Sequence, residues 1–249
     1  MIKFFRKIRQ DLLMENKTGK YLKYAIGEIV LVVIGILIAL QINNWNEGQK
    51  QKELEIKYLT EIRNSLESDL PDIEFNIEFN RSKLNSHQVI LQYINGELEY
   101  SDSLSFHFSN LLFNTRTLIN TSAYENLKSR GLEIISNDSL RMSITRLYAF
   151  EFHNLVDFET KDDHVFQYSQ FLPEITNALK INSLNPNEGF VSGAAEPIDI
   201  TGIKDDISFK NTLLINLVLR QYMVDNYENL IEMVKDEIQE IEAELQKLN

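Results

Sequence analysis

A run of apolar residues near the N-terminus, AIGEIVLVVIGILIALQINNWNE at residues 25–47, constrains this chain more than any other feature. Residues 26–42 contain twelve isoleucine, leucine or valine residues and one charged residue, Glu28. The aliphatic side chains favour membrane insertion by about 0.3–0.6 kcal/mol each, which together outweighs one acidic residue near the edge. The sequence therefore predicts a transmembrane helix over residues 24–45, which we call the span.

Aromatic residues flank the span at both ends. Tyr21 and Tyr24 precede it and Trp45 follows it. A helix from Tyr24 to Trp45 is about 32 Å long, which matches the thickness of the hydrocarbon core of a bilayer. Tyrosine and tryptophan are enriched at membrane–water interfaces, so we expect these three residues to lie at the two surfaces of the membrane.

The charges around the span predict its orientation. Basic residues concentrate before it, whereas the residues directly after it are polar or acidic, and the positive-inside rule then places the N-terminus in the cytoplasm. A cleaved signal peptide is the alternative, but the sequence Ala39-Leu40-Gln41 lacks the small residues of a cleavage site. The basic residues before the span are Lys3, Arg6, Lys7, Arg9, Lys17, Lys20 and Lys23.

Net charge separates the chain into two parts. The whole chain carries −12, and residues 1–28 hold seven basic and three acidic residues, which leaves −16 for the remainder. An acidic domain repels phosphate, so nucleic acid is not an expected partner. The basic N-terminal segment is instead attracted to the anionic lipids of the inner leaflet. The chain contains no cysteine, so it forms no disulfide.

The first 60 residues resemble a known family. The run GEIVLVVIGILIALQINNWNE, preceded by FFRKIR and KYLKYAI, is similar to an uncharacterised family of single-span membrane proteins from Bacteroidetes, chiefly flavobacteria. The segment NTSAYENLKSRGLEIISNDSL at residues 120–140 is similar to the same proteins. The resemblance implies a Gram-negative inner membrane with a periplasmic domain, and it supplies no activity and no catalytic residue.

Hydrophobic periodicity predicts an all-α fold. Residues 1–23 form a basic amphipathic cytoplasmic segment, residues 24–45 the span, and residues 46–249 a periplasmic helical domain. Apolar residues spaced alternately by three and four form one stripe over residues 56–98 and another over residues 213–248. Four polar residues interrupt these stripes, namely Arg63, Asn80, His87 and Arg220.

We expect the periplasmic domain to contain a long helix at 46–98, a helical cap at 103–180, a loop at 182–206 and a long C-terminal helix at 208–248. The two long helices should pack antiparallel, because neither can leave its apolar stripe in water. Pro71 should bend or interrupt the first of them. Arg63 should then reach one of the glutamates beside Ile241.

Within the span, small residues recur on one face. Gly27, Gly35 and Ala39 are separated by eight and four residues, and Gly35-x-x-x-Ala39 is a spacing that lets two helices approach closely. This face predicts a homo-oligomer or packing against another membrane protein. Glu28 lies beside it, and an intramembrane carboxylate is a candidate proton or ion carrier. The alternative is an interfacial residue that pairs with Lys20 or Lys23.

Signals for catalysis are weak. The sequence contains no phosphate-binding loop, dinucleotide fingerprint or serine nucleophile motif, and we predict no catalytic residue and no cofactor. His153, Asp157 and His164 share a helical face, but the neighbouring Lys161 disfavours a metal site there. We therefore predict a non-catalytic, membrane-anchored interaction or scaffold module. The alternatives are a proton- or ion-handling component that acts through Glu28, and a periplasmic sensor.

Overall fold

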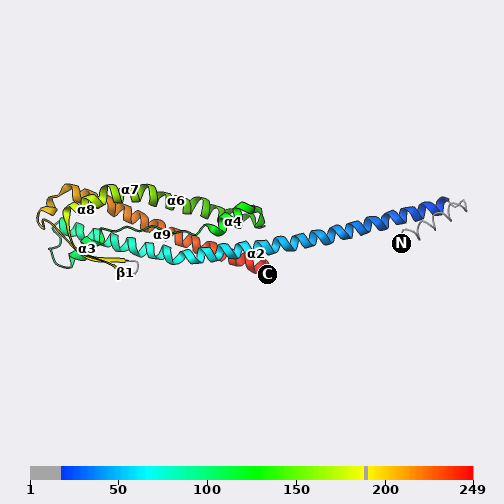
Figure 1. Cartoon of the computed structure of the whole chain (residues 1–249), viewed down its shortest axis with the longest axis horizontal. Helices are drawn as coiled ribbons and strands as arrows, with labels where there is room; N and C mark the ends of the chain where they lie inside the picture. The colour runs from blue at the N-terminus through cyan, green and yellow to red at the C-terminus, as the bar shows by residue number, and fades with distance from the viewer. Residues whose placement is uncertain (1–17, 188–189, 249) are drawn as a thin grey trace. The chain divides into compact units, whose positions relative to one another are not determined.

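The computed structural model describes residues 18–187 and 190–248 and divides the chain into two compact units, Met1–Leu54 and Glu55–Asn249. Helices dominate both units, as the periodicity predicted. The predicted cytoplasmic segment at residues 1–23 lies largely outside the described residues. The first described element, helix α2, runs from Thr18 to Ile94, so it includes the span and the first long helix of the second unit (Figure 1).

The first unit holds the apolar part of α2. It is long and apolar enough to cross a membrane, and none of its most apolar stretch is buried by protein. Isoleucine, leucine and valine side chains are exposed around the helix over residues 26–42. Exposure of these side chains to water would be unfavourable at every turn of the helix. A single helix that crosses a membrane needs apolar side chains on all sides, because lipid surrounds it.

The second half of α2 agrees with the prediction of one long helix, but it ends earlier than predicted. Pro71 lies inside the helix without ending it. The helix stops at Ile94 rather than at Leu98, because Gly96 takes a positive φ of 78° that a helix cannot continue through.

The remaining elements of the second unit are mostly short until the last helix (Figure 1). In chain order they are α3 (Leu104–Asn110), α4 (Ser122–Arg130), the 3₁₀ turn η1 (Leu132–Ile134), α5 (Asp138–Arg146), the π-helix η2 (Leu147–Phe152), α6 (His153–Asp157), the π-helix η3 (Phe158–Asp163), α7 (His164–Phe166), the π-helix η4 (Gln167–Phe171), α8 (Leu172–Ala178), β1 (Leu179–Asn187), β2 (Phe190–Pro197), the 3₁₀ turn η5 (Gly202–Asp205) and α9 (Ile207–Leu248). Because α5 to α8 follow one another without a break, we call residues 138–178 the π-containing helix.

Helix α9 packs antiparallel to the part of α2 in the second unit. Contacts between the two helices pair Asn95 with Lys210 near one end and Arg81 with Glu228 further along, at Nζ–Oδ1 and Nη2–Oε1 distances of 2.8 and 2.6 Å. This confirms the predicted antiparallel arrangement. The predicted partner of Arg63 was wrong, since its Nε lies 3.7 Å from Oε1 of Glu67 on the same helix.

Residues 182–206, predicted as a loop, contain a β-hairpin. Strands β1 and β2 pair antiparallel from Leu179↔Pro197 to Asn187↔Phe190, with an irregularity between Ile181 and Ser183. The glycines and prolines suggested a loop, but Gly193 lies where a Cβ would come within 2.4 Å of the Ser183 carbonyl oxygen. The glycine therefore permits a close approach of the strands.

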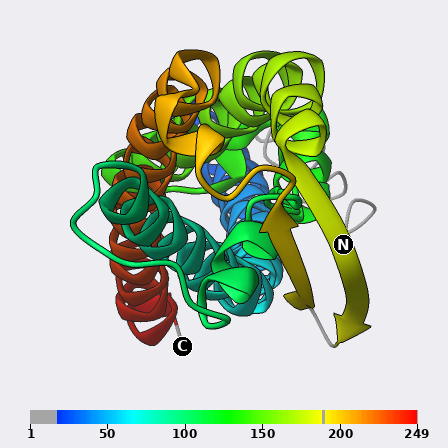
Figure 2. The same ribbon diagram turned by 90° about the vertical axis from the view of Figure 1, so that its left-hand side faces the viewer.

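The hairpin closes a hydrophobic core at one end of the second unit. Figure 2 shows the hairpin at this end of the unit, where β2 packs beside α3. Apolar residues from α2, α3, α8, β1, β2 and α9 meet there. They include Ile90, Tyr93, Leu104, Phe108, Phe171, Ile175, Leu179, Ala195, Phe209 and Leu213.

Candidate functional site

The predicted membrane residues lie on α2 within the first unit. Among the described residues, no atom lies within 4 Å of where a Cβ of Gly27 or Gly35 would stand. Glu28 is half-buried and engages another residue, so it is not an isolated carboxylate. Ala39 and Trp45 are exposed. The side chains of Tyr21 and Tyr24 lie outside the described residues.

The second unit contains a buried polar cluster that joins α2, α9 and the π-containing helix. At its centre the Arg220 guanidinium, 0% exposed, forms an ion pair with Asp163, which is 1% exposed. Arg220 Nη1 also donates to Oδ1 of Asn80 at 2.8 Å and to Oδ1 of Asn114 at 2.9 Å. Moving a charge pair out of water costs several kcal/mol per ion, so these added hydrogen bonds are needed to offset the cost.

Asp163 is held from a second side. Asn114 Nδ2 donates to its Oδ2 at 2.9 Å, and Gln167 Nε2 donates to its Oδ1 at 3.2 Å. Gln167 Nε2 also donates to Oδ1 of Asn216 on α9 at 2.6 Å. Each carboxylate oxygen therefore has a donor besides the guanidinium, and the geometry of the ion pair is fixed by three different segments.

A second buried carboxylate lies one turn earlier on the same helix. Glu159 accepts a hydrogen bond from the Tyr227 hydroxyl, and from the Thr117 backbone N–H and hydroxyl at 3.1 and 2.9 Å to its Oε1. Burial raises the pKa of Glu159, and these hydrogen bonds partly oppose that shift. Glu159 therefore connects α9 to the irregular segment that contains Thr117.

That irregular segment, residues 113–121, is held by carboxylates, and we call it the strap. The N–H of Leu118 donates to Oδ2 of Asp72 at 2.9 Å, and the N–H of Asn120 donates to Oδ2 of Asp69 at 3.1 Å. The prediction of a helical cap over 103–180 was wrong here, because these amides bond to side chains instead of to backbone carbonyls. Burial raises the Asp69 pKa to about 6, against the lowering effect of the Asn120 N–H.

Lys83 and His87 complete the buried polar cluster on α2. The Lys83 ammonium donates to the Phe113 carbonyl, and its pKa is lowered by burial and by the nearby Arg220 charge. His87 Nδ1 lies 2.7 Å from the Lys83 carbonyl oxygen, and its ring stacks on Phe171 at a centroid distance of 5.7 Å. Burial, then the charge on Lys83, lowers the His87 pKa to about 3, so this imidazole is neutral at ordinary pH.

The π-helices explain why so many polar groups meet. Residues buried along the π-containing helix recur at every fourth position, but in a regular α-helix such a series rotates by about 40° per step. The i→i+5 hydrogen bonds of η3 and η4 widen their turns and keep the series on one side. The buried series is Leu155, Glu159, Asp163, Gln167, Phe171 and Ile175.

This buried polar cluster holds the helices together and is closed to solvent. Arg220, Asp163, Lys83 and His87 are each at most 1% exposed, so a solute has no access to them. The sequence had shown Asn80, His87 and Arg220 as polar members of apolar stripes. The sequence analysis did not identify their partners. The one sequence pattern that could have indicated them is the recurrence of Glu159, Asp163 and Gln167 at every fourth position.

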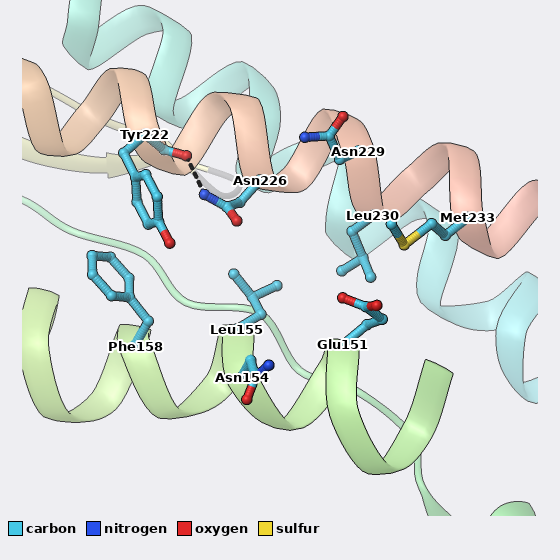
Figure 3. Close-up of a pocket in the computed structure, with 9 residues that line it drawn as sticks. All are labelled: Glu151, Asn154, Leu155, Phe158, Tyr222, Asn226, Asn229, Leu230 and Met233. Carbon is cyan, nitrogen blue, oxygen red and sulfur yellow. Dashed lines mark hydrogen bonds between the residues drawn. The ribbon is translucent and has the colours of Figure 1, made fainter. Parts of the chain in front are cut away.

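A groove that is accessible to solvent lies between α9 and the π-containing helix, with a volume of about 310 Å³. Figure 3 shows Phe158 facing Tyr222, with ring centroids 4.8 Å apart, and Leu155 pointing toward the α9 side. Asn226 Nδ2 donates to the Tyr222 carbonyl oxygen at 2.7 Å. The lining residues are Glu151, Asn154, Leu155, Phe158, Tyr222, Asn226, Asn229, Leu230 and Met233.

The groove is poor in charge. Glu151 is the one charged residue among those that line it, and Glu151 Oε1 lies 3.0 Å from Nε of Arg146. The histidines predicted as weak metal candidates lie elsewhere on the same helix, where Asp157 pairs with Lys161 at 2.6 Å and the His164 ring contacts the Tyr168 ring at a tilt, with centroids 4.4 Å apart. The groove combines apolar side chains with neutral amides, which suits a protein surface better than an ion.

Comparison with known proteins gives one match. Residues 28–191 match the model of a family of unknown function (DUF6090), which covers more than half of the chain. No curated protein and no solved structure matches. The matched residues begin within the span and extend through the strap and the π-containing helix into the hairpin. The chain therefore belongs to this family of unknown function.

Proposed function

We propose that the chain is a membrane-anchored helical interaction module. The span holds it in the inner membrane with the N-terminus in the cytoplasm, and the second unit works in the periplasm as a binding or scaffold domain. The observation that carries this proposal is the apolar stretch of α2, whose side chains are exposed around the whole helix and need lipid to cover them. The basic residues before the span support the orientation.

The location of three ionisable groups with shifted pKa values favours a binding role over catalysis. Three ionisable side chains whose pKa values burial lowers, Arg220, Lys83 and His87, are each 0% exposed within the second unit. Perturbed groups of an enzyme's active site would lie in a cleft that substrate can enter. These three side chains instead connect elements inside the unit, which supports a binding role over catalysis.

Single cysteines test the topology, because the chain has none of its own. We expect a membrane-impermeant maleimide, added to spheroplasts, to label Asn249→Cys and to spare Met14→Cys. Detergent lysis should then expose both positions, which controls for reactivity. Labelling of Met14→Cys alone in intact spheroplasts would invert the orientation and refute the proposal.

Copurification tests the binding role and separates it from a role for Glu28 in proton or ion handling. The full chain, solubilised from native membranes, should carry partner proteins or further copies of itself. Glu28→Gln should retain them, because an interaction module does not need this carboxylate to titrate. A variant that keeps normal membrane insertion but loses function would favour the proton- or ion-handling alternative.

A further inference from the structure

Helix α9 carries a second, uncharged stripe that the fold leaves largely exposed. Its six positions are separated by three, four, four, three and four residues, the spacing of a helix–helix seam. We call it the outer stripe. The four hydrophobic members are 52% (Ile215), 65% (Val218), 48% (Tyr222) and 40% (Met233) exposed. The members are Ile215, Val218, Tyr222, Asn226, Asn229 and Met233.

The outer stripe is distinct from the stripe that builds the second unit. Leu213, Val224 and Tyr227 of the inner stripe are buried against the rest of the unit. The outer stripe instead borders the groove shown in Figure 3, where Tyr222, Asn226, Asn229 and Met233 all lie on the α9 side. One face of α9 is therefore used within the chain and another, with seam spacing, is available to a helix from outside.

The outer stripe carries no charge although the chain is strongly acidic. All six members are neutral, whereas the sequence from residue 29 onward carries −16. Two copies of such a chain repel each other over most of their surface, and they repel least where a neutral strip meets its own equivalent. Asp225, Glu228 and Glu232 occupy positions between the members of the stripe, and acidic residues continue beyond it at Asp236 and Glu237.

We propose that a second copy of this chain covers the outer stripe, with the two α9 helices parallel and related by a two-fold axis along the seam. In that arrangement each stripe residue meets its own equivalent, so Val218 packs on Val218 and Asn226 faces Asn226. Asn226 Nδ2 keeps its hydrogen bond to the Tyr222 carbonyl oxygen in this arrangement, so the register rests on the apolar members of the stripe.

The parallel direction rests on the proposed membrane anchor. Each second unit is joined to its span at Glu55, so a parallel pair places both anchors at the same end, as a shared membrane requires. An antiparallel pair would place them at opposite ends. The self-association predicted for the face of Gly27 and Gly35 would bring the same two chains together.

The size of the outer stripe predicts a weak dimer that depends on the membrane anchors of both chains. The outer stripe is about 27 Å long, and two adjacent helices are roughly 20 Å wide, which gives about 500–600 Å² per copy. A standard stable interface buries about 800 Å² per partner. We therefore expect the pair to form between chains held in one membrane, where the effective concentration is high, and to dissociate on dilution in detergent.

Disulfide crosslinking of the full chain in native membranes tests the proposal. With a mild, membrane-permeant oxidant, Val218→Cys and Met233→Cys should each give dimers. The controls Gln221→Cys and Glu232→Cys, on the same helix but outside the stripe, should give at least about tenfold less. Equal yields at all four positions would indicate random collision and overturn the proposal, as would the absence of dimers at both stripe positions.

Two further measurements fix the direction and the surface. Mixed chains with Ile215→Cys or Met233→Cys should not crosslink to each other, and such a crosslink would refute the parallel arrangement. In the Met233→Cys background, Val218→Glu should abolish the dimer, whereas Gln221→Glu should leave it unchanged. Because Val218 is largely exposed, both variants should keep the thermal stability of the parent.

The crosslinking result is separable from the topology. The oxidant reaches both sides of the membrane, so the disulfide pattern does not depend on which side holds the second unit. An inverted labelling pattern would therefore refute the proposed location and leave the pairing intact. The correct topology with no stripe-specific crosslink would refute the pairing alone.

Discussion

Removal of the Asp163 carboxylate should expose how much the buried polar cluster depends on charge balance. In Asp163→Leu the Arg220 guanidinium stays buried and keeps two amide acceptors, Asn80 and Asn114, but loses its counter-ion. Breaking one partner of a buried ion pair costs about 3–5 kcal/mol. In a unit of this size each kcal/mol lowers Tm by about 2–4 °C, so we expect a decrease of roughly 6–20 °C.

The assay is thermal unfolding of the full chain in detergent micelles, followed by circular dichroism. A double variant, Asp163→Leu with Arg220→Met, should recover at least half of the lost Tm, because an apolar pair of similar volume needs no charge balance. The control is Asp157→Leu on the same helix, whose ion pair with Lys161 is exposed and should leave Tm unchanged. If the double variant melted at the sum of the two single losses, the cluster would not act as a charge-balanced unit.

Three further predictions concern other buried groups. Leu66→Asp should unfold the second unit, measured by circular dichroism, because it places an unpaired charge in a fully buried position. Tyr227→Phe should lower the free energy of unfolding in urea by about 1.5–3 kcal/mol, because the buried Glu159 carboxylate no longer accepts a hydrogen bond from the Tyr227 hydroxyl. Burial raises the Glu237 pKa to about 7, so the folded state binds a proton that the unfolded state releases, and stability should fall as pH rises from about 4.5 to 7. Glu237→Gln should flatten that part of the profile.

Each of these predictions has a matched control. Leu118→Asp, at an exposed position, should keep the fold that Leu66→Asp loses. Tyr222→Phe removes an exposed hydroxyl and should leave the urea midpoint unchanged. Glu242→Gln, at an exposed position on the same helix, should keep the parent's pH dependence. A Glu237→Gln profile identical to that of the parent would show that Glu237 does not carry the proton.

The large elements could be predicted from the sequence because each rests on a local periodicity. The apolar run predicted the span helix, and the two stripes predicted the antiparallel pair of α2 and α9. Gly131 after α4 and Asn137 before α5 were readable as a helix stop and a helix start, and Asn137 Oδ1 accepts the N–H groups of Ser139 and Leu140. These signals depend on a few neighbouring residues and on backbone geometry alone.

The rest depends on contacts distant in sequence. Glu159, Asp163 and Gln167 are polar and look like ordinary surface residues, although they recur at every fourth position, and the π-helical turns keep them on one side of the helix. The hairpin was missed because Gly193 reads as a loop residue until the partner strand is in place. Arg63 pairs with Glu67 on its own helix. Several carboxylates are within reach of Arg63, and hydrophobic periodicity does not predict which of them it pairs with.

The strap has a consequence for how opening of the second unit can be observed. The amides of Thr117, Leu118 and Asn120 bond to carboxylates from distant parts of the chain, so local helix formation cannot protect them from exchange with solvent deuterons. Their exchange rates should therefore report whether the tertiary contacts of the strap are formed, and should not depend on helix content. A perturbation that separates the π-containing helix from α2 without unfolding either should release these three amides first.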